Sequence, residues 1–309
     1  MEIPEPDEIA KSLNQLAWDH LNKLAYCGTQ EPDPSLNIDP EALIVFISII
    51  AAKPRNRTHP RILHESLVWG RNLNNFLSKS RYKSVLQSFD VKEGDQEWPR
   101  VNQFKNFIFE ETNHLSELSI NFQEDDLREY DQQEIEKSVR SNNRIFLRTL
   151  LGNIKRAEVV NFLSHGRDGN SHEISRKVLV DQPLVHRFLK DLKTTGLIST
   201  EQDGRQIINS WKGWDIGPNP KEKWRDWPGI YQDLLEIQKK SIVPKADDLT
   251  EYQRNHIKGQ IKKVIEETEK STKISLSRLK YLPESLFEPV EEANSDPEEE
   301  FGNIPDVNS

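Results

Sequence analysis

Six polar side chains near the middle of the chain have the types and spacing of a recognition surface. They are Gln182, His186, Arg187, Lys190 and Lys193 on one predicted helix, and Arg205 shortly after it. Gln and Arg side chains form paired hydrogen bonds with base edges, and Lys neutralises phosphate groups. The other side of the same helix is apolar, with the i, i+3, i+4, i+7 spacing of a buried stripe. The stripe consists of Val185, Phe188, Leu189 and Leu192. The helix is therefore predicted to hold its polar side chains toward solvent.

No other group of residues predicts catalysis or metal binding. His59 and His64 lie close to Glu65, and His165 and His172 flank a glycine turn, but no HExxH or comparable ligand spacing occurs. We expect surface or capping histidines and no metal site. The chain also lacks a Walker loop, a GxGxxG and a GxSxG motif, so we expect no cofactor and no enzymatic activity.

The polar helix belongs to a predicted unit of three helices and a β-hairpin. A first helix is expected over 156–164, and Asn170 followed by Glu173 resembles the capping box of a second, short helix. Gly196 has the position of a C′ glycine after the third helix. Two polar-apolar strands then flank a turn near Asp203 and Gly204, with Arg205 at its tip. Residues 154–211 therefore predict a winged helix-turn-helix.

The run from Gln182 to Ile198 resembles the recognition helix and the start of the wing in ArsR/MarR-type bacterial winged-helix regulators. In those families this helix enters the DNA major groove and the wing touches the flanking backbone. The resemblance implies DNA contacts for Gln182, His186, Arg187, Lys190 and Arg205. It does not extend to metal sensing, because ArsR metal sensors need clusters of Cys or His and Cys27 is the single cysteine.

The remaining segments predict a mainly α protein. Residues 1–143 form a predicted helical domain, with an amphipathic helix over 9–24, a helix capped by Asp39 with Pro40 at its first position, helices over 61–70 and 72–89, and a short one near 101–109. Residues 144–212 are the winged-helix domain. Residues 213–283 combine a Trp-rich packed segment with two helices, near 231–240 and 250–271, and 284–309 predict a disordered acidic tail.

Charge is distributed unevenly along the chain. The total is −9, but residues 144–212 carry 12 Lys and Arg against 7 Asp and Glu, a net of +5. Residues 1–143 have a net of −8, residues 213–283 of +3, and residues 284–309 of −9. The basic excess is greatest in the segment that carries the helix-turn-helix pattern, which favours a nucleic-acid partner for that segment.

Composition predicts an intracellular protein outside the membrane. No apolar run approaches the ~18 residues of a membrane span, and mean hydropathy is −0.75. The acidic, proline-bearing N-terminus does not resemble a signal peptide. A single cysteine excludes an internal disulfide and fits the reducing cytoplasm.

Two functions follow from these patterns. The first is a sequence-specific regulator of the repressor type that binds double-stranded DNA, with the helical front half forming a homodimer or sensing a ligand. The alternative is an adaptor or antitoxin-like protein whose acidic N-terminal half or tail binds a protein partner. In that case the winged helix would serve autoregulation or protein contact.

Overall fold

The computed structural model describes residues 6–24, 37–53, 56, 58–109, 128–213 and 224–241. These residues are mainly α-helical, with one two-stranded antiparallel sheet. The elements in chain order are α1 (Pro6–Leu24), α2 (Pro40–Ala52), α3 (Pro60–Asn72), the 3-10 helix η2 (Asn74–Phe76), α4 (Lys79–Ser88), α5 (Trp98–Phe109), α6 (Gln132–Arg140), α7 (Asn143–Leu151), α8 (Ile154–Ser164), α9 (Ser171–Val178), α10 (Gln182–Thr194), β1 (Ile198–Asp203), β2 (Gln206–Trp211) and α11 (Trp227–Ser241).

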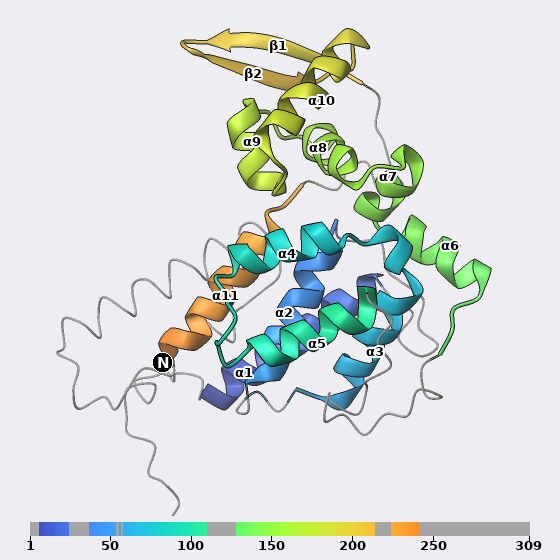
Figure 1. The fold of residues 1–309 in the computed structure, drawn as a ribbon, viewed down its shortest axis with the longest axis vertical. Helices are drawn as coiled ribbons and strands as arrows, with labels where there is room; N and C mark the ends of the chain where they lie inside the picture. The colour runs from blue at the N-terminus through green and yellow to red at the C-terminus, as the bar shows by residue number, and fades with distance from the viewer. Residues whose placement is uncertain are drawn as a thin grey trace, which may run out of the picture.

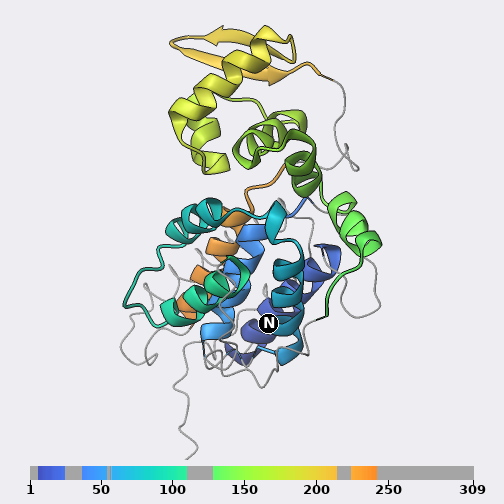
Figure 2. The same ribbon diagram turned by 45° about the vertical axis from the view of Figure 1, so that its right-hand side comes forward.

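The described residues form two lobes (Figures 1 and 2). The helical lobe contains α1 to α6 and α11, and the hairpin lobe contains α7 to α10 with β1 and β2. Each lobe has its own apolar core. The boundary runs through α7, because Ile145 packs in the core of the helical lobe and Leu147 in that of the hairpin lobe.

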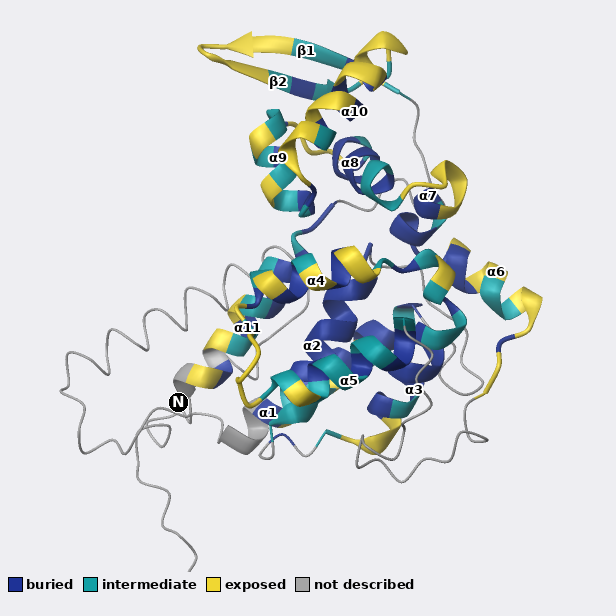
Figure 3. Ribbon diagram, in the orientation of Figure 1, coloured by how far each residue is buried: buried dark blue, intermediate teal, exposed yellow. Residues whose placement is uncertain are grey.

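Helix α2 is the centre of the helical lobe. Its sequence from Pro40 to Ala52 is almost entirely apolar, and the residues from Pro40 to Ile50 are buried, as the dark blue ribbon of Figure 3 shows. A helix that is apolar on every side must be covered on every side. Helices α1, α3, α4, α5 and α11 all contact it. The predicted start of α2 is confirmed: Asp39 is the N-cap and accepts a hydrogen bond from the Ala42 amide.

The single helix predicted over 72–89 is wrong, because the chain breaks there into η2 and α4. Ser78 has extended backbone angles and its hydroxyl accepts from the Arg81 amide, so it caps a new helix. The apolar spacing continues across this break, since Leu73, Leu77, Val85 and Leu86 are all buried. Periodicity alone therefore could not locate it.

Within the hairpin lobe, α8, α9 and α10 pack against one another and precede the hairpin. Val185, Phe188, Leu189 and Leu192 of α10 are all buried, which confirms the predicted stripe. They pack with residues of α8 and α9 such as Phe162 and Ile174. Asn170 caps α9 by accepting from the amides of His172 and Glu173. Strands β1 and β2 pair from Ile198 with Trp211 to Asp203 with Gln206, so Gly204 and Arg205 form the turn.

Helix α11 follows the hairpin in sequence but packs in the helical lobe. Trp227, Ile230, Tyr231 and Leu234 belong to the same core as α1 and α2. The hairpin lobe is thus inserted between α6 and α11. No helix within the described residues is long and apolar enough to cross a membrane. The predicted helix over 250–271, the predicted disordered tail over 284–309 and Cys27 lie outside the described residues.

Candidate nucleic-acid interface

A groove of about 590 Å³ lies between α10, the first turn of α9 and the hairpin. Three of the cationic side chains that line it are Lys190 and Lys193 on α10 and Arg205 in the hairpin turn. The other lining residues are Asn170, Ser171, His172, His186, Leu189, Thr200, Gln206, Ile207 and Asn209. No Asp or Glu lines the groove among the described residues. Its chemistry therefore favours an anionic occupant.

Four of the six predicted site residues meet in this groove. His186, Lys190 and Lys193 lie along one stripe of α10, and Arg205 reaches the groove from the hairpin. Gln182 and Arg187 are also exposed but do not line it. Helical geometry places Arg187 about 100° around α10 from His186, on the side that faces solvent away from the core. The exposed outer surface of α10 is visible in Figure 3.

Sequence reasoning missed the wall that α9 contributes. Ser171 and His172 begin α9, and Asn170, its N-cap, donates a 2.8 Å hydrogen bond to Gln206 of β2. This bond ties the second helix to the hairpin across the groove. The capping pattern at Asn170 indicated where α9 begins, but it carried no information on what α9 faces.

The C-terminus of α10 and the segment before α9 are both fixed relative to the hairpin. At its C-terminus, the Gly196 amide donates to Lys193 O at 3.0 Å and the Leu197 amide to Leu192 O at 3.0 Å. This is a Schellman motif, and it requires the left-handed φ of +75° that Gly196 adopts. At the base of the hairpin, Asn209 exchanges backbone hydrogen bonds with Gly169 before α9. The groove walls are therefore set by backbone contacts.

The carboxylates near α10 are paired away from the groove. Asp191 accepts from Arg156 of α8 at 2.7 Å, and Asp181 accepts from Lys155 at 3.1 Å. By contrast, Arg187, Lys190 and Lys193 make no ion pair with the residues that the structure describes. The pairing leaves the outer face of α10 and the groove with an excess of positive charge.

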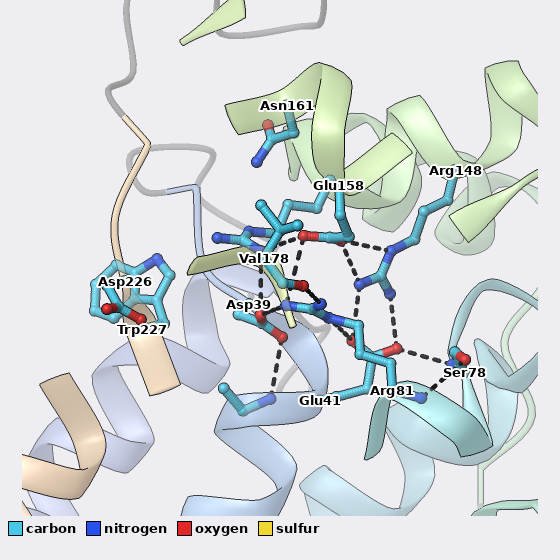
Figure 4. A network of polar contacts seen from close by, with 12 residues as sticks. Asp39, Glu41, Ser78, Arg81, Arg148, Glu158, Asn161, Val178, Asp226 and Trp227 are labelled. Atoms are coloured by element: carbon cyan, nitrogen blue, oxygen red, sulfur yellow. Dashed lines mark hydrogen bonds and ion pairs between the residues drawn. The ribbon is translucent and has the colours of Figure 1, made fainter. Parts of the chain in front are cut away.

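Behind this surface, six buried charged side chains connect the two lobes (Figure 4). We call them the ion network. The network consists of Asp39, Glu41, Arg81, Arg144, Arg148 and Glu158, and each side chain is at most 4% exposed. It contains three carboxyl and three guanidinium groups, so opposite charges are balanced. A buried charge without a partner costs several kcal/mol, which is why these groups occur together.

Arg148 of α7 shows the geometry of the ion network. Its two terminal nitrogens donate to both oxygens of Glu41 at 2.9 and 2.8 Å, a paired contact with the helical lobe. It also donates to Glu158 of α8 at 2.7 Å. Glu41 in turn accepts from the Ser78 amide at 2.8 Å, at the break before α4. One side chain thus joins α2, α7, α8 and the start of α4.

Arg81 of α4 extends the ion network to the junction between α9 and α10. Its guanidinium contacts Asp39 and donates to the carbonyl of Val178, the last residue of α9. The next residue, Leu179, has left-handed backbone angles of 54° and 47° and packs against the core of the helical lobe. The turn that leads into α10 is therefore held by contacts from the helical lobe.

The pKa values of the three carboxyl groups in the ion network shift in different directions. Burial would raise the pKa of Asp39, but Arg81, Arg144 and Arg148 outweigh it and hold that pKa well below its usual range. The same balance between burial and the three guanidinium groups lowers the pKa of Glu158. Asp39 and Glu158 are therefore charged at neutral pH. Burial raises the pKa of Glu41 above its usual value, although Arg148 acts in the opposite direction.

The histidines differ partly from the expectation of surface or capping roles. His59 caps α3 by accepting from the Arg61 amide, as expected. His20 and His165 are buried instead, at 1% and 3% exposure. His165 lies 2.9 Å from Asn143 Nδ2 and 3.0 Å from Asn161 O, which satisfies its ring in the core. His20 contacts Tyr231, 211 residues away, and His165 contacts Asn143, 22 residues away, so local spacing did not reveal these two contacts.

The tryptophans of the predicted Trp-rich segment are structural where they are described. Trp224 and Trp227 are buried, Trp227 donates to Asn37 O at 2.6 Å, and Trp211 packs against the core of the hairpin lobe. Trp214 lies outside the described residues. Within the described residues, no group of three His, Cys, Asp or Glu side chains is arranged to hold a metal ion. Comparisons with family models, with curated proteins and with solved structures gave no match.

Proposed function

We propose that residues 154–211 form a winged helix-turn-helix that binds double-stranded DNA, and that the protein is a transcriptional regulator of the repressor type. The groove between α10 and the hairpin carries this proposal, because it combines Lys190, Lys193 and Arg205 without a lining carboxylate. Helix α10 would enter the major groove, and the hairpin would contact the flanking backbone.

The residues divide into two roles under this proposal. Arg187 and Gln182 lie outside the groove on the exposed part of α10, where they would reach base edges. Lys190, Lys193 and Arg205 line the groove and would hold a phosphate segment of one strand. Base contacts provide sequence preference, and phosphate contacts provide affinity that depends on salt.

Surface charge supports this role in spite of the acidic total. Arg144, Arg148 and Glu158 are buried in the ion network, which leaves ten Lys and Arg against six Asp and Glu in residues 144–212. The local excess thus remains positive once the buried charges are removed. DNA association depends on such a local excess more than on total charge.

The proposal is tested by selecting bound sequences from random duplex DNA and then measuring the affinity for the enriched sequence as a function of salt. We expect Arg187→Ala to cost about 1–3 kcal/mol and to relax preference at one base position. Lys190→Ala should weaken all sequences alike and reduce the salt slope by about 1.

Lys83→Ala is the matched control, because Lys83 is an exposed lysine of α4 in the helical lobe. It should leave both affinity and slope unchanged. Failure to bind any duplex at low salt would refute DNA binding. Co-purification of a stoichiometric protein partner, with Arg187→Ala behaving as the natural chain, would favour the adaptor function.

A further inference from the structure

The groove has features that suit an acidic polypeptide as well as DNA. Lys190 and Lys193 lie on one wall and Arg205 on the other, so carboxylates between them could meet cations from both sides. The hairpin also presents Ile207 to the groove, and its side chain is 59% exposed. An exposed apolar side chain among cations favours an occupant that carries both carboxylates and apolar groups.

This chain contains such a segment. Residues 284–309 have nine Asp and Glu and no Lys or Arg. Glu298, Glu299 and Glu300 are followed directly by Phe301, so three carboxylates adjoin one aromatic ring. We propose that residues 284–309 bind in the groove of the same chain and compete with DNA for it. The binding itself rests on the groove, and only the competition rests on the proposed function.

The connecting chain is long enough for this contact. Residues 242–283 separate the end of α11 from the acidic segment, a stretch of 42 residues. Even at the helical rise of 1.5 Å per residue they would span about 63 Å. A folded chain of 309 residues has a radius of gyration of about 19 Å, and therefore a diameter near 50 Å. The segment can therefore reach the groove from α11 without any rearrangement of the lobes.

A weak contact is sufficient because the two partners share one chain. A tethered segment has an effective concentration of about 1 mM. If the free segment bound with a Kd of about 0.1 mM, tethering would weaken DNA binding about tenfold. Added salt would weaken both contacts, because both depend on the same cations.

Zero-length carbodiimide crosslinking of the full chain tests the contact without DNA. The reagent joins a lysine amine to a carboxylate that touches it, and mass spectrometry identifies the pair. We expect crosslinks from residues 284–309 to Lys190 and Lys193, and their loss at high salt. Lys11 and Lys83 are equally exposed lysines of the helical lobe and provide the internal control.

Crosslinks spread evenly over Lys11, Lys83 and the groove lysines would overturn the proposal. The reaction is run on a mixture of isotope-labelled and unlabelled chains at low concentration. Crosslinks between the two kinds of chain would place a second copy's segment in the groove and would also overturn the intramolecular contact.

The competition is tested with the full-length variant E298Q/E299Q/E300Q. It should bind duplex DNA several-fold to about tenfold more tightly than the natural chain at low salt. The variant E93Q/E129Q/E136Q removes the same charge from exposed glutamates of the helical lobe and should change affinity little. If both variants gained DNA affinity equally, the gain would be an effect of net charge, and the proposed competition between the acidic segment and DNA would be overturned. If no variant binds DNA while the groove crosslinks persist, the proposed function fails and the intramolecular contact stands.

Discussion

Asp39 has two structural roles that a single substitution can separate. One oxygen caps α2 by accepting from the Ala42 amide, and the other contacts Arg81 and Arg144 in the ion network. Asn is an equally good N-cap but carries no charge. Asp39→Asn therefore keeps the cap and removes one buried carboxylate, which should lower the unfolding free energy by about 3–5 kcal/mol. Urea unfolding followed by circular dichroism measures this loss.

Asp191→Asn is the matched control for that experiment. Asp191 pairs with Arg156 at 2.7 Å, but both side chains are about half exposed. Exposed pairs contribute about 0–1 kcal/mol, so the control should be nearly neutral. A similar loss in both variants would show that the ion network stabilises no more than a surface pair.

The sequence predicted that Asp39 caps α2, but it did not predict the ion pairs of Asp39 with Arg81 and Arg144. The pattern Asp39-Pro40 indicates a helix start through contacts within four residues. Its ionic partners Arg81 and Arg144 lie 42 and 105 residues away. A buried arginine has the same one-letter code as a surface arginine, and only the packing of α2 against α4 and α7 distinguishes them.

At the scale of elements, helix α10 was predictable because every feature that defines it is local. Its apolar stripe and the glycine after its end lie within 15 residues, and the structure has them as predicted. The residues of the groove's α9 wall were not predictable in this way. That wall depends on the hairpin folding back over Asn170, and this contact joins residues 36 positions apart.

The turn between α9 and α10 can be tested by comparing the stabilities of a glycine and an alanine variant at Leu179. Leu179 has a positive φ of 54°, which costs an L-residue about 1–2 kcal/mol. Leu179→Ala keeps this strain and loses the packing on the helical lobe, whereas Leu179→Gly loses the same packing but relieves the strain. We therefore expect the glycine variant to be about 1 kcal/mol more stable than the alanine variant in urea unfolding.

The order should reverse at Lys83, an exposed position inside α4. There alanine favours the helix over glycine by about 1 kcal/mol. If the alanine variant were more stable than the glycine variant at both Leu179 and Lys83, the turn would have to adopt another conformation in solution.

At the scale of the whole molecule, the chain leaves the helical lobe through α6 and returns to it with α11. The sequence indicated helices before and after the hairpin, but it gave no sign that the first and last described helices pack together. That contact depends on α1, α2 and α11 sharing one core across the inserted hairpin lobe. His20 of α1 lies 2.8 Å from the hydroxyl of Tyr231 in α11, a contact between residues 211 positions apart.

The buried ring of His20 should make the packing of α1 against α11 dependent on pH. Burial, with Lys23 and Arg225 adding to it, lowers the pKa of His20 to about 3. Between pH ~6.5 and ~3 the unfolded chain binds a proton at this residue that the folded chain excludes. The unfolding free energy should therefore fall as pH is lowered through this range, by about 1.4 kcal/mol per unit from this residue alone.

His20→Asn removes the titrating ring and keeps a polar side chain beside Tyr231. Between pH 6.5 and 5 the natural chain should lose about 2 kcal/mol more stability than His20→Asn, measured by urea unfolding at both pH values. His186→Asn removes an exposed histidine of the groove and should follow the slope of the natural chain. Parallel slopes for the natural chain and His20→Asn would show that the α1–α11 contact opens before the ring is protonated. In that case the packing of α1 against α11 would have to depend on Trp227 and the apolar side chains around it, which do not titrate.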